Sequence, residues 1–158
     1  MVQRSNNSLT VRAYVSDDRG DCLAIFDSNI GLYFAELERA RFEAFLDEPI
    51  GFYLVIVDQN ALIACGGYAA DTTDPTKSVF CWGMVHRDRH GTGLGTLLST
   101  TRLEGIERAG IFKSVELRTS QHTAGFYEKL GFKVKRTTQD GIAPGIDEVI
   151  MSKMLSLS

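Results

Sequence analysis

The sequence has no excess of positive charge, no long apolar run, and little cysteine or proline. Its 158 residues carry 17 lysines and arginines against 20 aspartates and glutamates, a net charge of −3. Domains that bind nucleic acid usually show a basic excess, so this balance argues against such a partner. No apolar run approaches the roughly 20 residues that cross a bilayer. The stretch "MVQRSNNSLT" lacks the apolar segment of a signal peptide. We therefore expect a cytoplasmic protein that does not contact membranes.

The cysteines Cys22, Cys65 and Cys81 are an odd number without a CxxC spacing. This pattern is not a disulfide framework. Cys65 and Cys81 lie in apolar runs, which predicts buried thiols in a reducing compartment. Repeats and low-complexity tracts are also absent, and nothing in the sequence suggests a metal site. The length fits one domain, so we expect residues 1–158 to form a single unit.

Hydrophobic periodicity predicts an alternation of strands and helices. Strands are expected at 9–15, 52–58, 61–70, 78–85, 113–119, 132–138 and 147–155, with a loop at 139–146. Helices are expected from an N-cap at Ser16 to about 26–29, then at 32–49, 93–108 and 122–130. The order is β-α-α-β-β-β-α-β-α-β-β. It predicts an α/β (α+β) fold with a mixed, mostly antiparallel sheet of about seven strands and helices on both faces. The composition of strand 78–85 predicts burial on both of its faces.

Three glycines stand at alternate positions in "HGTGLGTLL" (90–98), between an expected strand and an expected helix. The first turn of a helix has N–H groups without partners, and the helix dipole makes this end positive. Glycines let an anion approach those N–H groups closely. The position therefore favours an anion site, with a tight turn that binds nothing as the alternative. The dinucleotide spacing G-x-G-x-x-G and the Walker Gly-Lys-Ser/Thr sequence are both absent.

Two motifs make the chain resemble a known family, the GCN5-related N-acetyltransferases. The family pattern V-x-x-x-x-[RQ]-G-x-G-x-[GA]-x-x-L corresponds to residues 85–98, and "FYEKLGF" (126–132) matches a short helix frequent in that family. The order of elements agrees as well, so the resemblance covers nearly the whole chain. Two positions depart from it, since His90 replaces Arg or Gln and Ser120 replaces a frequent Asn. Neither change removes an anion site made of backbone N–H groups.

The resemblance implies that acetyl-CoA is a co-substrate. The glycine loop would hold its pyrophosphate, and the pantetheine arm would lie between strands 78–85 and 113–119, where they splay apart. A backbone N–H near the end of strand 78–85 would face the thioester carbonyl as an oxyanion site. The residues assigned to cofactor binding on this basis are Met84, Val85, His90, Gly91, Thr92, Gly93, Leu94, Gly95, Thr96 and Ser120.

The implied reaction is the direct attack of an amine on the thioester. It needs a deprotonated amine and a proton for the leaving thiolate. Tyr127 aligns with the family tyrosine that supplies this proton, whereas a packed aromatic residue is the alternative role. His86 and His122 flank the expected cleft, and alternation does not fix the face of Glu116. We therefore assign no general base.

Family members contact their amine through the segment between the first two helices, the fourth strand and the loop between the last two strands. The corresponding acidic and aromatic rim would consist of Asp27, Tyr33, Phe34, Glu36 and Trp82. Such a rim suits an ammonium group. The alternative is that the rings only pack against the second helix and Glu36 is solvated. A small molecule, an amino acid or a peptide lysine stay open as acceptors, and so does a homodimer. The second functional hypothesis is a non-catalytic acyl-CoA-binding or sensing domain.

Overall fold

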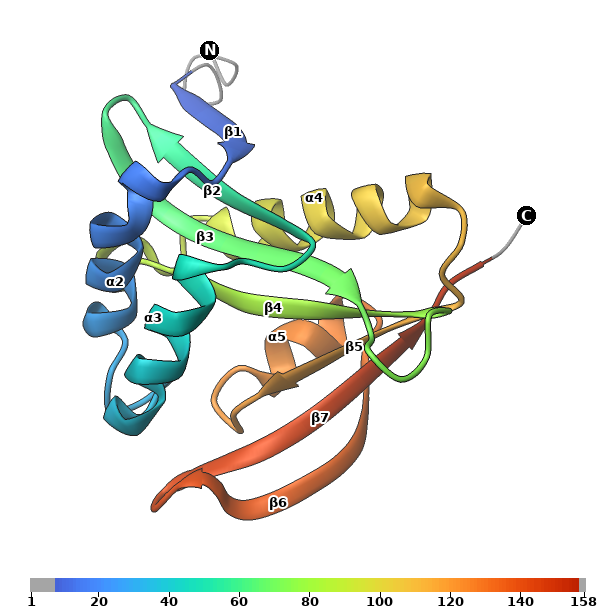
Figure 1. Cartoon of the computed structure of the whole chain (residues 1–158). Coiled ribbons are helices and arrows are strands. Elements are labelled where there is room, and N and C mark those ends of the chain that lie inside the picture. The colour runs from blue at the N-terminus through green and yellow to red at the C-terminus, as the bar shows by residue number, and fades with distance from the viewer. Residues whose placement is uncertain (1–7, 157–158) are drawn as a thin grey trace.

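The structure is a computed structural model that describes residues 8–156. Seven strands form one sheet in the order β1-β2-β3-β4-β5-β7-β6 (Figure 1). The strands are β1 (Leu9–Ala13), β2 (Phe52–Asp58), β3 (Ala61–Ala70), β4 (Lys77–Val85), β5 (Ser114–Thr119), β6 (Lys133–Ala143) and β7 (Ile146–Met154). Neighbouring strands are antiparallel, except that β4 and β5 are parallel. The sheet is therefore mixed and mostly antiparallel, as predicted.

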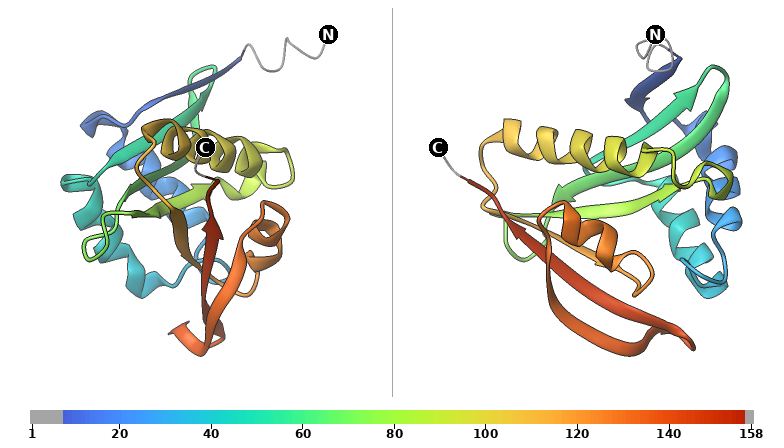
Figure 2. Two further views of the ribbon diagram at one scale, coloured as in Figure 1. Left: turned by 90° about the vertical axis from the view of Figure 1, so that its right-hand side faces the viewer. Right: turned by 180° about the vertical axis from the view of Figure 1, so that it is seen from behind.

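Helices cover both faces of this sheet (Figures 1 and 2). The helices are α2 (Arg19–Ser28), α3 (Arg39–Asp47), α4 (Leu94–Ala109) and α5 (Ala124–Lys129), with 3-10 turns η1 (Ser16–Asp18), η2 (Glu36–Glu38) and η3 (Arg87–Arg89). Two successive residues of β2 show the two helical layers, because successive side chains of a strand point to opposite faces of the sheet. Val55 packs with α2 and α3, whereas Ile56 packs with α4. In the described residues, no helix has both the length and the apolar character needed to cross a membrane. The predicted fold class is confirmed.

The predicted starts of the first two helices are wrong. Ser16 is not an N-cap, because a 3-10 turn precedes α2 and the Asp18 carboxylate accepts the N–H of Val15 at 2.9 Å. The second helix does not begin at residue 32. Gly31 has a φ of +105° and donates its N–H to Phe34 at 2.8 Å, so a turn occupies this segment. The α-helical part of that prediction begins only at Arg39.

Two predictions about the strands are also wrong. The expected loop at 139–146 is largely strand, since β6 continues to Ala143 and β7 begins at Ile146. Strand β4 is not buried on both faces, because most of its residues stay half-buried. Cys81 on this strand is half-buried too, whereas Cys65 is buried as expected. The residues of β4 stay accessible because this strand lines a cavity.

The divergence of β4 from β5 creates that cavity. The two strands pair only over Lys77–Val79 and then separate. Further along β4, the register with β3 shifts at a bulge, where Trp82 has a φ of +44°. This left-handed conformation is unfavourable for a side chain that is not glycine. The hydroxyl of Tyr53 donates to the Trp82 carbonyl at 2.8 Å and fixes the bulge. The bulge in β4 thus lies just beyond the point where β5 leaves this strand.

Candidate active site

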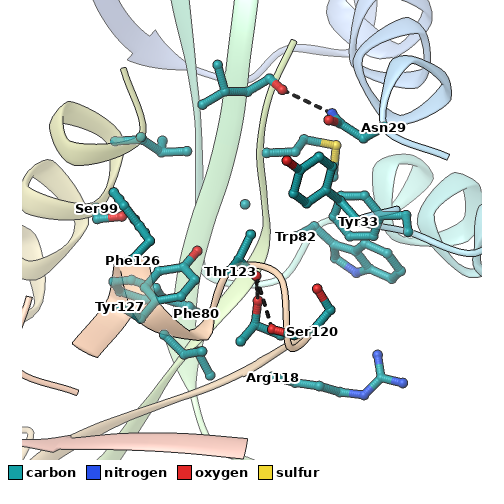
Figure 3. A pocket seen from close by; sticks show the side chains of 18 of the residues that line it. Asn29, Tyr33, Phe80, Trp82, Ser99, Arg118, Ser120, Thr123, Phe126 and Tyr127 are labelled. Carbon is teal, nitrogen blue, oxygen red and sulfur yellow. Dashed lines mark hydrogen bonds between the residues drawn. The ribbon is translucent and has the colours of Figure 1, made fainter. Parts of the chain in front are cut away.

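A cavity of about 760 Å³ extends through the gap between β4 and β5 (Figure 3). Its volume lies in the range of small-molecule sites. Its wall includes side chains from the segment that links α2 to α3, and from α4 and α5 on the other face of the sheet. The cavity therefore connects the two helical layers, and both the glycine loop and the aromatic residues of the expected acceptor rim line it.

The glycines of the loop serve two different purposes. Gly91 has a φ of +78° and Gly93 a φ of +86°, a conformation that other residues rarely adopt. A Cβ atom at either position would face open space, so only the backbone requires glycine there. Gly95 has an ordinary conformation, but its Cβ would lie 3.3 Å from the Phe126 ring. The loop and the "FYEKLGF" motif (126–132) are therefore in direct contact.

The ring of His90 is held against the end of β4. Its Nε2 lies 2.9 Å from the Val85 carbonyl oxygen, which also accepts from Asn29 Nδ2 at 3.0 Å. The ring packs edge-on against Tyr33, with centroids 5.1 Å apart. The His90 side chain thus fixes the loop to the strand. In the described chain, Asn29 Oδ1 is the one buried side-chain oxygen or nitrogen without a hydrogen-bond partner, and Asn29 lines the cavity.

The residues assigned to the cofactor divide into two groups. Those that line the cavity are Met84, Val85, His90, Gly91, Gly93, Gly95, Thr96 and Ser120. Thr92 and Leu94 are not part of its wall. The Thr92 hydroxyl donates to the Arg89 carbonyl at 2.5 Å, and Leu94 is buried in the core beneath α4. Because Gly93 is the N-cap of α4, the backbone N–H groups of the first turn follow directly after it.

Tyr127 has a packed ring and a hydroxyl at the cavity. Its ring lies edge-on against Phe126 and Phe132, with centroids 5.0 and 5.8 Å away. The Tyr127 side chain nevertheless lines the cavity beside Phe80 and Ser99 (Figure 3). The two roles considered for Tyr127 are therefore compatible, since packing fixes the ring and leaves the polar end at the cavity.

Ser120 begins the turn that leads into α5. It is buried, and its Oγ accepts the N–H of His122 at 3.2 Å. Its carbonyl accepts the N–H groups of Thr123 and Ala124 at 3.2 and 3.1 Å. The hydroxyls of Thr119 and Thr123 are in short contact across the same turn. Ser120 thus positions the helix that carries Tyr127, besides lining the cavity itself.

The acidic members of the expected rim do not reach the cavity. Asp27 pairs with Arg39 at 2.8 Å, which lowers the pKa of the Asp27 carboxyl through a hydrogen bond. Glu36 is exposed and lies outside the cavity wall. Tyr33, Phe34 and Trp82 do line the cavity, and Phe34 stacks on Trp82 with ring centroids 6.4 Å apart. The rim therefore has its aromatic part but not the two predicted carboxylates.

A different carboxylate, Glu38, occupies this end of the cavity. It is 2% exposed, and its Oε1 accepts the N–H of Ala35 at 3.0 Å. Its Oε2 lies 3.4 Å from Nη1 of Arg118, whose Nε donates to Glu148 at 2.5 Å. We call Glu38, Arg118 and Glu148 the acceptor-end charge cluster. With two carboxylates for one guanidinium, this cluster has a formal charge of −1.

Some residues of the cavity were not predicted from the sequence, and they differ in whether a local sequence pattern pointed to them. Glu38 stands at the third position of a helical start, where glutamate often caps the backbone, so its capping role had a recognisable signal. Its burial at the cavity had none, because Arg118 lies 80 residues further along the chain. Arg102 and Asn29 gave no signal either. Of the two flanking histidines, His122 lines the cavity whereas His86 does not. Among the described residues, no group of three His, Cys, Asp or Glu side chains could hold a metal ion.

The family identity follows from a sequence comparison. The family model described as Acetyltransferase (GNAT) domain matches residues 49–134, more than half of the chain. The chain therefore belongs to the GNAT acetyltransferase family and is an acyltransferase. This result confirms the resemblance found in the two motifs. No curated protein matches the chain by sequence.

Solved structures show the same fold. A GCN5-related N-acetyltransferase from Kribbella flavida is 19% identical, with a TM-score of 0.78 over 96% of this chain and 100% of that one. The ribosomal-protein-S18-alanine N-acetyltransferase from Escherichia coli is 15% identical, with a TM-score of 0.77 over 95% of this chain and 96% of that one. YncA from Salmonella typhimurium, solved with its cofactor acetyl-CoA, is 16% identical, with a TM-score of 0.74 over 94% of both chains.

Proposed function

We propose that this chain, over residues 1–158, transfers the acetyl group of acetyl-CoA to the primary amine of a small molecule or an amino acid. One observation supports this above all. The glycine loop at the start of α4 and the Tyr127 side chain line the same cavity, in the gap between β4 and β5. The anion site would bind the pyrophosphate of acetyl-CoA, and the proton donor would serve the leaving thiolate. The family membership supports the same class of reaction.

The open glycine loop fits a pyrophosphate. Gly91 and Gly93 line the cavity just ahead of the first α4 turn, and neither has a side chain that could shield the N–H groups of that turn. In this proposal Thr92 and Leu94 contribute their backbone N–H groups only. Met84, Val85 and Ser120 would contact the pantetheine arm along the gap. When bound, acetyl-CoA supplies an acetyl group activated as a thioester.

Tyr127 is the proposed general acid. The amine nitrogen forms a bond to the acetyl carbon while the carbon–sulfur bond breaks. The electron pair of that bond goes to sulfur, and Tyr127 gives sulfur its proton. A backbone N–H near the β4 bulge would stabilise the charge that develops on the carbonyl oxygen. The amine loses its own proton to water, since we assign no side chain as the base.

The acceptor end of the cavity suits a cationic amine before it is deprotonated. Its wall combines the rings of Tyr33, Phe34 and Trp82 with two members of the acceptor-end charge cluster, Glu38 and Arg118. The third member, Glu148, pairs with Arg118 from outside the wall and brings the formal charge of the cluster to −1. Aromatic faces and carboxylates both attract ammonium groups. A peptide amine stays an alternative acceptor. The cytoplasmic location and the homodimer stay predictions as well.

A thiol-release assay with acetyl-CoA and a panel of amines tests the proposal. The panel contains polyamines, free amino acids, aromatic amines and a lysine peptide. We expect one class to release CoA at a rate clearly above hydrolysis, with the acetylated amine identified by mass spectrometry. The other hypothesis, a non-catalytic acyl-CoA sensor, predicts binding of acetyl-CoA without turnover of any amine. That result across the whole panel would contradict the proposed function.

A further inference from the structure

Arg102 is a buried cation without an ionic partner in the described part of the chain. It lies on α4, is 1% exposed, and takes part in no salt bridge there. Its Nε and Nη1 donate to the carbonyls of Leu98 and Gly67 at a long 3.4 Å. Burial of a charge without an opposite charge is unfavourable for folding. A residue of this kind calls for a reason other than packing.

The sheet leaves room for this guanidinium at the β4 bulge. A Cβ on Gly83 would lie 2.8 Å from both terminal nitrogens of Arg102, and a Cβ on Gly66 would lie 3.4 Å from its central carbon. The guanidinium carbon also stands 3.8 Å from the centre of the Phe80 ring, which stabilises the cation. Two glycines and one ring on β3 and β4 therefore hold the charge in one place.

The Phe80 ring places Arg102 and Tyr127 on the same part of the cavity wall, because it contacts the Arg102 guanidinium and lies beside Tyr127 (Figure 3). Burial lowers the pKa of Arg102, and charge and hydrogen-bond interactions with the Tyr127 phenol oppose this decrease. Tyr53 and Cys81 also raise the pKa of Arg102, but each has a smaller effect on it than Tyr127 has. Both Arg102 and Tyr127 line the cavity. The cation therefore lies close to the residue that would donate the proton.

We propose that Arg102 is a positioning residue that holds the Tyr127 hydroxyl toward the leaving sulfur and stabilises the phenolate formed when that proton is given up. This role rests on the proposed function. In the step, the carbon–sulfur bond breaks, its electron pair goes to sulfur, and the Tyr127 proton moves to sulfur. The proton released by the amine then restores the phenol through solvent. A neighbouring fixed cation favours the phenolate without any rearrangement of the protein.

A double-mutant cycle tests this role. The variants are R102M, which keeps the volume of the side chain without its charge, R102K, Y127F, and R102M combined with Y127F. With the best amine of the panel, we expect R102M to lower kcat by about 10-fold to 100-fold and R102K to lower it less. We expect the Kd of acetyl-CoA to stay within about twofold. In the Y127F background, R102M should change kcat by less than about twofold, because the group it acts through is gone.

A stability measurement separates this role from a structural one. Because R102M removes an unpaired buried charge, its thermal unfolding midpoint should not fall below that of the wild type. Equal losses of kcat from R102M in both backgrounds would overturn the positioning role while the transferase function stands. If R102M does not fold, R102K in the two backgrounds gives the same comparison. A wild-type chain that binds acetyl-CoA but acetylates no amine overturns the proposed function, and this role with it.

Discussion

The two ends of the cavity are built from different parts of the polypeptide. The proposed cofactor end depends on backbone conformation, with Gly91 and Gly93 in left-handed geometry ahead of the first turn of α4. The proposed acceptor end depends on side chains, namely the aromatic wall and the buried Glu38. A backbone site tolerates exchange of its neighbouring side chains, whereas a side-chain site changes with each substitution. The same fold can therefore acquire a new acceptor while its cofactor end stays as it is.

The largest effect is expected at Tyr127, which stands between the two ends. Tyr127→Phe should lower turnover by about 100-fold to 10,000-fold, the usual contribution of a general acid. The affinity for acetyl-CoA should stay unchanged, as measured by titration beside the thiol-release assay. Tyr68→Phe is the matched control, because Tyr68 lies outside the cavity wall. Unchanged turnover of Tyr127→Phe would remove this residue from the mechanism.

A smaller effect, confined to the acceptor end, is expected from Glu38→Gln. Glutamine keeps an acceptor for the Ala35 N–H but removes the charge. The KM of a cationic amine should rise by about 10-fold, in line with the loss of one charge-assisted hydrogen bond, whereas the acetyl-CoA affinity should not change. Glu36→Gln, an exposed neighbour outside the cavity wall, is the control and should leave both values alone. An equal change of the amine KM in the two variants would show that the Glu38 carboxylate does not contribute to amine binding.

Gly93→Ala addresses the cofactor end. A left-handed conformation costs a residue with a Cβ atom about 1–2 kcal/mol, so the free energy of unfolding should fall by about that much. The loop should also leave the geometry that exposes its N–H groups, and the acetyl-CoA Kd should rise severalfold. Gly20→Ala is the control, since this helical glycine has no neighbour within 4 Å of an added Cβ and no positive φ. It should be neutral or stabilising by about 0.5–1 kcal/mol in urea unfolding. Equal behaviour of both variants would contradict a conformational requirement at Gly93.

The smallest effect is expected from His90→Arg. An arginine adds positive charge near the pyrophosphate and should tighten acetyl-CoA binding by about twofold to fivefold, in the range of an exposed ion pair. The same change removes the contact of the His90 ring with Val85, which limits the gain. Titration of both proteins at one ionic strength measures the difference. Equal affinities would mean that this end indeed does not depend on the side chain at position 90.

The sequence was sufficient for the parts of the molecule whose signals are local. The glycine spacing and the "FYEKLGF" helix (126–132) indicated the cavity wall, and strand periodicity gave β2 and β3 at their observed bounds. Glu38 and Arg102 could not be predicted, because their burial depends on strands far away along the chain. For the same reason the rim predicted from the sequence contains Asp27 and Glu36 and lacks Glu38. Local charge shows which residues are acidic, but only packing decides which of them faces inward.

The contact between Gly95 and the Phe126 ring links the two motifs mechanically. Because a methyl group at Gly95 would press on Phe126 at 3.3 Å, the ring that neighbours Tyr127 would have to shift. The proposed cofactor seat and the proposed proton donor are therefore packed against one another, although about thirty residues separate them. A substitution that adds volume at position 95 or at position 126 would therefore displace the residue on the other side of this contact.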